Sequence, residues 1–323
     1  MNIKRKQNEY TLSSEQHASF LKRFWIYQKE RFPFMGHGLL VAAFSFSAVS
    51  YSRICRGEPG FVEWKTFLVG IFTTISLFLL VRIFDEFKDA ADDERYRREL
   101  PVPRGLVSLK ELRDLGIILV IFQITINWIF FPKMLLLYGI AVGYLCLMGK
   151  EFFISEWLKK HQFWYVVSHM FIIPLIDIYA SGLDWLLKGV PAPPGLLFFF
   201  AVSFMSGIVL EIGRKIRIPE DEQAGVLTYS AMHGDRKATL LWILMLFLSF
   251  VFSIAASGYA GYGNTGWIVL TVLFIISAVP AMLYLNRAGR KRAKMIEAFS
   301  GLWAISMYLT LGGVPMLERL VGS

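Results

Sequence analysis

The chain has 323 residues, of which 55% are hydrophobic and only 18% are charged. That apolar fraction and a mean hydropathy of +0.49 exclude an ordinary soluble enzyme and indicate a protein with several membrane spans. A net charge of +9 would suit a nucleic-acid-binding protein, but the basic residues lie in short gaps between apolar runs. We therefore expect a lipid bilayer around the protein and no nucleic acid partner.

The first 33 residues are polar and lack both the apolar core and the small-residue cleavage site of a signal peptide. Phe20, Phe24 and Trp25 stand here among basic residues, which predicts an amphipathic helix at the membrane interface. We expect a single transmembrane domain over residues 1–323, in which residues 1–33 form a polar, interfacial N-terminal segment.

Nine apolar segments approach the roughly 20 residues that a membrane-spanning helix needs. They are 34–51, 65–87, 109–131, 133–149, 163–183, 195–213, 238–258, 266–285 and 297–317. Pro132 separates the third segment from the fourth, because proline cannot continue a helical hydrogen-bond ladder. The predicted fold class is all-α, as a polytopic integral membrane protein with nine transmembrane helices.

Lys and Arg are distributed unevenly over the predicted loops. If the N-terminus is cytoplasmic, 28 of the 34 basic residues lie in segments on the cytoplasmic side. This excess follows the positive-inside rule and predicts a protein of the bacterial inner membrane or an equivalent membrane. It also places two acidic loops, which follow the second and sixth spans, together on the cytoplasmic face.

Three aspartates at the end of the second span repeat every four residues: Asp85, Asp89 and Asp93. On a helix this spacing sets the carboxylates on one face, about 6 Å apart along the axis. Carboxylates so close repel one another unless a cation lies between them. Oxygen ligands of this kind suit Mg²⁺, which shares its coordination shell with water and substrate phosphates.

Basic residues follow the aspartates. Arg98 and Arg104, with Arg95 and Arg97, are suited to bind the oxygens of a diphosphate. The alternative interpretation is a solvated acidic helix end followed by a basic loop. Acidic residues at a helix C-terminus oppose the helix macrodipole, however, so we favour a site for a metal ion and a diphosphate.

A second charged loop follows the sixth span and opens on the same face. Acids and bases alternate in it: Glu211, Arg214, Lys215, Arg217, Glu220, Asp221 and Glu222. Pro219 is expected to interrupt the helix and to leave the last three acids in the turn beyond it. Together with the aspartates of the first loop, these residues would close a cage of the size of a diphosphate.

At these two loops the chain resembles the UbiA superfamily of intramembrane prenyltransferases, which includes terpene cyclases. The first family motif, NDxxDxxxD, is matched by DEFKDAADD from Asp85 to Asp93, with Asp in place of Asn and Glu86 in place of Asp. The stretch PVPRGLVS, residues 101–108, matches the segment that follows this motif in the family.

The second family motif is matched in its tail by Asp221, Gly225 and Thr228. Before that tail the family carries aspartates, whereas this chain has three cations, Arg214, Lys215 and Arg217. The departure leaves the second half of the site with fewer carboxylates than the family pattern has.

The resemblance implies a UbiA-like bundle around a central intramembrane cavity and a Mg²⁺-dependent ionisation of an isoprenyl diphosphate. The residues implied as catalytic and metal-binding are Asp85, Asp89, Asp93 and Asp221, with Glu211 and Glu220 as further metal ligands. Those implied as diphosphate-binding are Arg98, Arg104, Arg214 and Lys215, with Lys88 as an additional candidate.

Physical chemistry agrees with this reaction. Cleavage of an allylic C–O bond gives an allylic cation and a pyrophosphate anion, which positioned cations stabilise while an apolar pocket excludes water. The favoured outcome is prenyl transfer to a small, aromatic acceptor, and the alternative is terpene cyclisation without an acceptor. A membrane transporter is less favoured, because the charges lie at the ends of the spans and not at the midplane.

Polar residues inside predicted spans include Asn127, His169 and Asp177, and either His169 or Asp177 could act as a base or stabilise a cation. Ionisable groups at membrane depth are costly and are often functional. Polar side chains between membrane helices also serve as hydrogen-bonded links. We favour this structural interpretation for all three.

The first prediction concerns topology. Single cysteines introduced at Glu94 and Glu222, one in each acidic loop, should both be shielded from a membrane-impermeant thiol reagent in intact cells. Both should react once the membrane is opened, because the distribution of basic residues places both loops in the cytoplasm. Labelling of either position from outside intact cells would contradict this topology.

Overall fold

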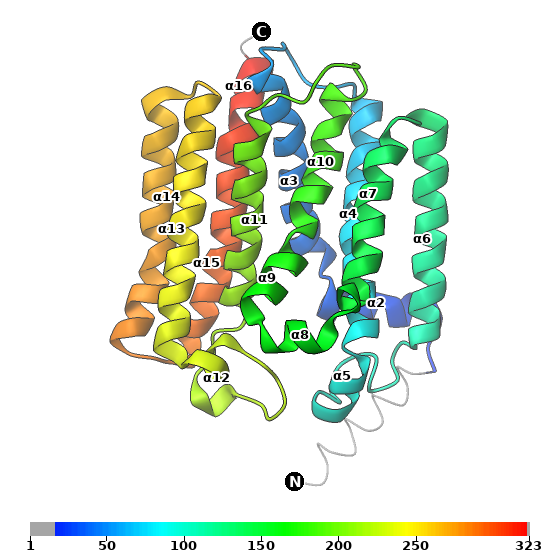
Figure 1. Ribbon diagram of the computed structural model, residues 1–323, viewed down its shortest axis with the longest axis vertical. Coiled ribbons are helices and arrows are strands. Elements are labelled where there is room, and N and C mark those ends of the chain that lie inside the picture. The colour runs from blue at the N-terminus through cyan, green and yellow to red at the C-terminus, as the bar shows by residue number, and fades with distance from the viewer. Residues whose placement is uncertain (1–16, 322–323) are drawn as a thin grey trace.

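The computed structural model describes residues 17–321, and within that range the chain consists of helices and loops without any strand (Figure 1). The first half contains α2 (Phe20–Arg31), α3 (Phe34–Cys55), α4 (Trp64–Lys88), α5 (Ala90–Tyr96), α6 (Leu109–Phe130), α7 (Met134–Gly149), η1 (Glu151–Phe153) and α8 (Ser155–Lys160). The second half contains α9 (Gln162–Met170), α10 (Ile172–Trp185), α11 (Leu196–Gly213), η2 (Pro219–Asp221), α12 (Tyr229–His233), α13 (Asp235–Tyr259), α14 (Gly263–Asn286), α15 (Arg290–Tyr308), η3 (Leu309–Gly313) and α16 (Val314–Val321).

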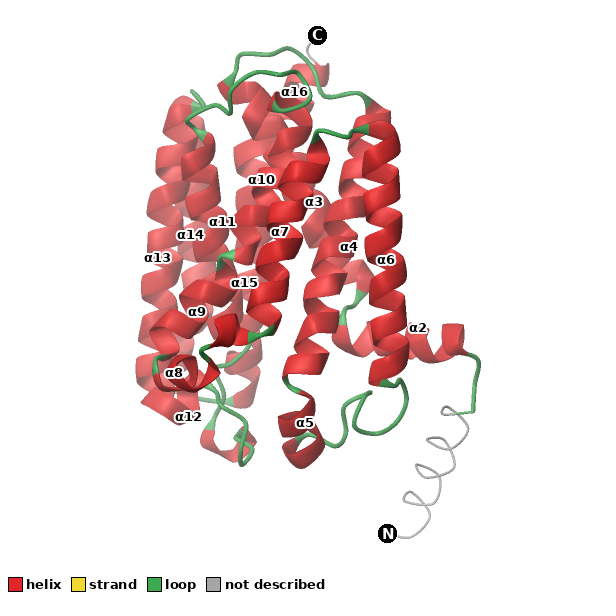
Figure 2. Ribbon diagram, turned by 45° about the vertical axis from the view of Figure 1, so that its right-hand side comes forward, coloured by secondary structure: helices red, strands yellow, loops and turns green. Residues whose placement is uncertain are grey.

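The predicted all-α, polytopic fold is confirmed. Among the described residues, eight helical segments are long and apolar enough to cross a membrane, and α7 is a ninth, shorter apolar helix of 16 residues. Each of the nine predicted spans corresponds to one of these segments. The predicted N-terminal segment is described only from residue 17, where α2 lies across the end of the bundle (Figure 2); residues 1–16 lie outside the described part.

Two of the predicted spans are interrupted helices, and proline explains both interruptions. The fifth span divides between Met170 and Ile172 into α9 and α10. Pro174 cannot donate a hydrogen bond to the carbonyl of residue 170, and its ring collides with that carbonyl, so α9 ends there. Pro315 stands four residues after Leu311, and the last span forms the π-helical turn η3 at that point.

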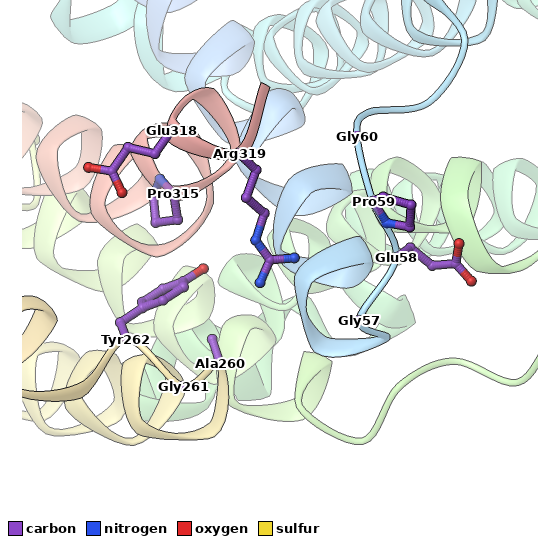
Figure 3. A pocket seen from close by; sticks show the side chains of 10 residues that line it. All are labelled: Gly57, Glu58, Pro59, Gly60, Ala260, Gly261, Tyr262, Pro315, Glu318 and Arg319. Atoms are coloured by element: carbon purple, nitrogen blue, oxygen red, sulfur yellow. The ribbon is translucent and has the colours of Figure 1, made fainter. Parts of the chain in front are cut away.

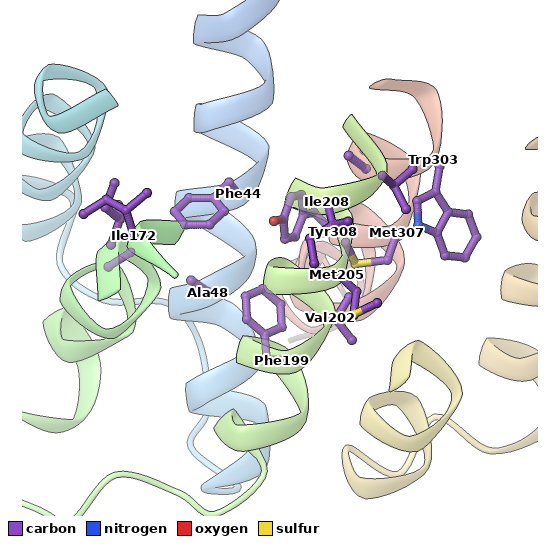
Figure 4. Close-up of a cluster of buried hydrophobic side chains, with 14 of the residues drawn as sticks. Phe44, Ala48, Ile172, Phe199, Val202, Met205, Ile208, Trp303, Met307 and Tyr308 are labelled. Atoms are coloured by element: carbon purple, nitrogen blue, oxygen red, sulfur yellow. The ribbon is translucent and has the colours of Figure 1, made fainter. Parts of the chain in front are cut away.

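The core is built around α3, which packs against α4, α10, α15 and η3. Its Phe44 ring lies edge-on to Tyr308 of α15, with centroids 5.4 Å apart, and Tyr308 in turn lies 5.8 Å from Phe199 of α11. Ala48 of α3 is fully buried beside them (Figure 4). A small residue beside large aromatic rings leaves room for the rings, so that together they fill the interior between the helices.

Apolar and polar side chains divide between the outside and the inside of the bundle, as a lipid solvent requires. The outer faces expose large apolar groups such as Ile118, Trp128 and Ile268. Inside, the amide of Asn127 donates to Thr73 Oγ1 at 3.1 Å and accepts from Tyr179 Oη at 2.8 Å. This network links α4, α6 and α10, which confirms the structural interpretation of Asn127.

A buried ionic cluster ties α3 to α10 near the end of the bundle where α16 lies. The carboxylate of Asp184 is fully buried and accepts from Ser52 Oγ at 2.8 Å, Arg53 Nη1 at 3.1 Å and Arg56 Nη1 at 2.7 Å. A buried charge is tolerated when it is paired and fully hydrogen-bonded, as here. The cluster fixes the relative positions of two central helices.

The second prediction concerns the closest approach between helices. A Cβ atom at Gly312 in η3 would lie 2.7 Å from the Ser47 Cα of α3 and would overlap the neighbouring backbone oxygen. Backbone cannot move aside as a flexible side chain does, so Gly312→Ala should destabilise the fold by about 1–3 kcal/mol. The measurement is the thermal unfolding temperature in detergent, where we expect a fall of several degrees.

The matched control for this prediction is Gly301→Ala in α15, where an added Cβ meets no atom within 4 Å. Alanine is favoured over glycine inside a helix, so this variant should unfold at the same temperature or higher. Equal unfolding temperatures for the two variants would contradict the close approach at Gly312.

Candidate functional site

The loops that carry the predicted site residues meet at one end of the bundle. The segments α5, α8 and α12 lie together there, opposite the end that carries α16 (Figures 1 and 2). We call this the charged end. The second loop lies directly against the first, because Gly225 adopts a positive φ of 79° and its Cα faces the ring of Tyr96 in α5. Any side chain at this glycine would overlap that ring.

Asp85 and Asp89 are the more open members of the aspartate ladder. The helix predicted to carry all three aspartates is interrupted at Asp89, which ends α4 and precedes α5. Lys88 Nζ lies 3.6 Å from Asp85 Oδ1 and 3.9 Å from Asp89 Oδ1. Partial burial raises the pKa of Asp89, and the charges of Asp85 and Asp93 raise it further, while Lys88 opposes them. Additional positive charge would relieve this repulsion.

Asp93 is buried and faces α2. Its Oδ2 lies 3.8 Å from Arg31 Nη2 and accepts no hydrogen bond within the described part of the chain. Burial raises the pKa of this carboxyl, and the nearby arginines act in the opposite direction. Glu86, the second residue of the family motif, also faces α2. Its Oε1 accepts a hydrogen bond from Arg31 Nε at 2.6 Å and lies 3.2 Å from Arg82 Nη2. These two acids therefore join α2 to the site.

The second loop supplies cations that lie close to the first. Glu211, buried at the end of α11, accepts from Arg214 Nε at 2.7 Å and lies 2.7 Å from Lys215 Nζ. The pKa of Arg214 is raised, first by Glu211 and additionally by Asp85 and Asp89. The guanidinium of Arg214 thus lies within the electrostatic field of carboxylates on both loops, and this brings the two halves of the predicted site together.

Asp221 and Glu220 lie in the short η2 turn and are placed differently. Both carboxylate oxygens of Asp221 bond to Arg290, at the start of α15, with Oδ2 accepting from Nε at 2.7 Å. The hydrogen bond from Arg290 lowers the pKa of Asp221. Glu220 is exposed to solvent. Thr228 caps α12 by accepting from the amide of Ala231 at 3.0 Å, so this part of the motif shapes the loop.

The two arginines predicted from the first loop have local partners. Arg104 donates from Nη1 and Nη2 to the Glu30 carboxylate, each at 2.8 Å, and from Nη1 to the carbonyl of Glu99 at 2.8 Å. Arg98 is more exposed and donates to the carbonyl of Glu94 at 3.1 Å. Arg104 therefore fastens its loop to α2, and Arg98 lies on the outer side of the charged end.

Sequence reasoning gave too little weight to three residues beside the aspartates. Lys88 Nζ donates to Tyr165 Oη at 2.9 Å, and the Tyr165 ring stacks on the His169 imidazole with centroids 4.0 Å apart. The signal was available: Lys88 stands between two ladder aspartates, and Tyr165 and His169 are four residues apart in an apolar helix, so they share one face. The contact between Lys88 of α4 and Tyr165 of α9 could not be foreseen from the sequence.

The residues of the charged end fit a magnesium ion in donor type. Within residues 17–321, no three His, Cys, Asp or Glu side chains gather in an arrangement that holds a metal ion by themselves. Mg²⁺ in phosphate-binding enzymes commonly takes only one or two carboxylates and completes its shell with substrate phosphates and water. Asp85 and Asp89, partly open and short of positive charge, suit that use.

A hollow of about 630 Å³ lies at the other end of the bundle, between Glu58, Tyr262 and Arg319 (Figure 3). It is an open depression between loops, and the aspartates and cations of both charged loops lie at the opposite end of the molecule. The chemistry of the predicted site therefore belongs to the charged end and not to this hollow.

Comparison with known proteins identifies the family. The UbiA prenyltransferase family profile matches residues 36–307, while no curated protein matches at a significant level. An apo UbiA homologue from Aeropyrum pernix K1 is structurally similar, with a TM-score of 0.63 and 15% identity over 84% of this chain and 96% of its own. A digeranylgeranylglyceryl phosphate synthase has a TM-score of 0.60 and 14% identity over 91% of this chain and 99% of its own. The structural matches support the fold, and from the profile match the chain belongs to the UbiA prenyltransferase family.

Proposed function

We propose that this protein ionises an isoprenyl diphosphate at the charged end and transfers the prenyl group to a small, aromatic acceptor. Family membership supports a prenyltransferase enzyme and not a transporter. The observation that carries the substrate assignment is the position of Arg214, which is paired with Glu211 and lies in the field of Asp85 and Asp89. Carboxylates and cations arranged in this way suit a diphosphate that binds with a metal ion.

The reaction begins with cleavage of the allylic C–O bond, in which the electron pair stays on the diphosphate oxygen. Mg²⁺, when bound, supplies positive charge to that oxygen and lowers the barrier. Arg214 and Lys215 contribute in the same way from the second loop, as fixed cations aimed at the developing charge. Lys88 is a third cation, placed between the two open aspartates.

We assign the metal first to Asp85 and Asp89, with Asp93 as the third ladder ligand. Two other predicted ligands already form ion pairs in this structure. Glu211 is paired with Arg214 and Lys215, and Asp221 is paired with Arg290. Ion pairs at a protein surface are weak enough to exchange when a substrate and a divalent cation bind. Glu211, Glu220 and Asp221 therefore remain predicted ligands of a second metal ion, and Arg98 and Arg104 remain predicted diphosphate contacts.

The allylic cation needs apolar, aromatic surroundings that exclude water. Such groups lie next to the charged end, where the ring of Tyr144 is 5.3 Å from Phe152 and 5.7 Å from Phe171. Aromatic faces attract a cation through their quadrupole. These rings support the proposal that the prenyl chain extends from the charged end into the bundle.

Terpene cyclisation is the second candidate function. The cation-rich second loop, with Arg214, Lys215 and Arg217, departs from the aspartate pattern of family members that use an acceptor. Both reactions share the ionisation step and differ only in the nucleophile. Incubation of the purified protein with C10, C15 and C20 diphosphates and Mg²⁺, with and without aromatic acceptors, separates them by the mass of the product.

The direction in which the charged end faces follows from the distribution of basic residues. All of the segments with most Lys and Arg lie at this end or precede α2, so we propose that it faces the cytoplasm. A water-soluble diphosphate head group would then reach the site from the cytoplasm, while its prenyl chain enters from the membrane.

The third prediction tests the proposed reaction. Asp89→Asn removes a carboxylate charge where Mg²⁺ and the diphosphate are expected to meet, so pyrophosphate release should fall by about 100-fold or more. The matched control is Asp92→Asn, which removes an exposed carboxylate three residues along in α5. It should keep activity within about twofold, as exposed surface changes usually do. Pyrophosphate release by Asp89→Asn at the wild-type rate with limiting Mg²⁺ would contradict the metal assignment.

The fourth prediction separates the roles of the second loop. Arg214→Ala removes one charge-assisted contact, worth about 1.5–3 kcal/mol, so diphosphate affinity should fall by roughly tenfold to a hundredfold. Its Mg²⁺ requirement should stay unchanged. Asp221→Ala should instead raise the Mg²⁺ concentration for half-maximal activity. Turnover is titrated with Mg²⁺ at fixed substrate, with the exposed Arg236→Ala as the control.

Arg290→Ala completes this experiment, because Arg290 is the present partner of Asp221. If Asp221 serves the metal, loss of Arg290 frees its carboxylate and should leave the Mg²⁺ requirement the same or lower. A rise in the Mg²⁺ requirement for Arg290→Ala, equal to that of Asp221→Ala, would show that the pair only shapes the loop.

A further inference from the structure

We propose that His169 is a catalytic residue of this reaction: its Nε2 accepts the proton that is released when the prenyl cation is captured. The inference rests on the proposed function and adds to it a base, which neither the aspartate ladder nor the basic loop provides. Four observations carry it: the tautomer of the imidazole, the unpartnered Nε2, the position beside the charged end, and the rings that surround it.

The hydrogen bond of Nδ1 determines which nitrogen is the base. His169 Nδ1 lies 2.8 Å from the carbonyl oxygen of Tyr165. A carbonyl oxygen only accepts hydrogen bonds, so Nδ1 carries the proton of the neutral ring and Nε2 carries the lone pair. Ser168 Oγ donates to the same carbonyl at 3.1 Å and lies 3.3 Å from Nδ1, where its own lone pair faces the Nδ1 proton. The backbone of α9 therefore fixes Nε2 as a proton acceptor.

That acceptor has no partner in the described structure. Only 5% of His169 is exposed, and Nε2 is buried without a hydrogen bond among residues 17–321. A buried polar atom left unsatisfied typically costs about 1–3 kcal/mol, so most such atoms are paired. A histidine whose one nitrogen is fixed and whose other is left open resembles the arrangement of a general base, in which a positioned imidazole waits for a substrate proton.

The imidazole lies directly behind the ionic part of the site. Its ring stacks on Tyr165 at 4.0 Å, the Tyr165 hydroxyl accepts from Lys88 at 2.9 Å, and Lys88 lies 3.6 Å from Asp85. The charged groups that act on the imidazole come from both halves of the site. Lys88 and Asp85 lie at the end of α4, and Glu211 lies at the end of α11. The ring thus stands between the diphosphate end and the apolar interior.

An aromatic wall lies beside the imidazole. The Phe152 ring lies edge-on, with centroids 6.2 Å from His169, and it also contacts Tyr144. Phe152 is held there by a turn in which Glu151, Phe152 and Phe153 all have positive φ. Non-glycine residues rarely adopt this conformation, and it is found where function requires a particular placement. The reactive carbon of a prenyl diphosphate bound at Asp85 and Asp89 would face this wall.

The step balances without any further reactant. The allylic C–O bond breaks and its electron pair leaves with the diphosphate. The π electrons or lone pair of the acceptor form the new bond to the prenyl carbon, and the acceptor then loses a C–H or O–H proton to Nε2. The electron pair of that C–H or O–H bond stays on the acceptor and neutralises its positive charge. The charges of Asp85 and Glu211 favour the imidazolium, whereas burial and the charge of Lys88 oppose it. It therefore returns its proton to the departing diphosphate or to water.

Two variants test this inference with two products measured in the same reaction. His169→Phe keeps a ring to stack on Tyr165, and His169→Gln keeps a polar side chain; neither accepts a proton. Both should release pyrophosphate within about threefold of wild type, because ionisation does not use the base. Prenylated or cyclised product should fall at least tenfold relative to pyrophosphate, and prenyl alcohol from capture by water should rise, since general base catalysis typically contributes about 10²–10⁴-fold.

The matched control is His161→Gln, which changes an exposed histidine that stacks on Trp157 just before α9. It should leave the ratio of product to pyrophosphate unchanged. Variants of His169 that keep the wild-type ratio would overturn the inference, and so would variants that lose pyrophosphate and product equally, which indicates a structural role. Absence of pyrophosphate release from the wild-type protein would instead overturn the proposed function itself.

Discussion

The charged end depends on one electrostatic arrangement: the guanidinium of Arg214 is paired with Glu211 in its own loop and lies in the electrostatic field of Asp85 and Asp89 at the end of α4. Glu211 is buried, whereas about half of the Arg214 side chain is exposed, so water and salt screen the attraction on its outer side. The attraction holds two loops together that are more than 120 residues apart in the sequence. Without it, the positive charge beside Asp85 and Asp89 would come from Lys88 and from Arg82, whose Nη1 lies 3.8 Å from Asp85 Oδ2. The glycine at position 225, which allows the second loop to touch α5, serves the same approach.

Pro174 determines where Tyr165 and His169 stand, beside the aspartates of the site. Pro174 ends α9 close to the charged end, so Tyr165 and His169 stand on the short first half of an interrupted span. The adjoining turn at Phe152 completes the wall around them. A continuous helix would have carried these two residues along the apolar interior, where an unpaired imidazole is costly. In the proposed mechanism, the break would bring a titratable group close to the reacting carbon.

The sequence alone predicted the parts of this structure that depend on local pattern. Apolar runs of about 20 residues located the spans, and the charged gaps between them located the charged end. Long-range pairing was beyond its reach. Arg31 binds Glu86 and approaches Asp93 from a helix more than 50 residues away, and Arg290 takes Asp221 from another span. Such pairs depend on how the helices pack, which sequence periodicity does not encode. The sequence therefore predicted three equivalent aspartates, whereas Asp93 is buried against α2 and Asp85 and Asp89 are more open.

The charge balance of the site supports the proposal that a metal ion is needed in spite of the cations that replace the family's aspartates. Three carboxylates, Asp85, Asp89 and Glu211, are balanced by three cations, Lys88, Arg214 and Lys215. Arg82, which lies 3.8 Å from Asp85, is balanced by Glu86, so the formal charge of the whole group is zero. A multiply charged diphosphate gains little net attraction from a neutral cluster, and its approach to the aspartates is opposed. A divalent cation between the aspartates and the diphosphate reverses that opposition and frees the three side-chain cations to face the leaving oxygen. In the proposed mechanism, replacement of aspartates by arginine and lysine in the second loop would thus change which residues stabilise the leaving group, while the first loop would still need the metal.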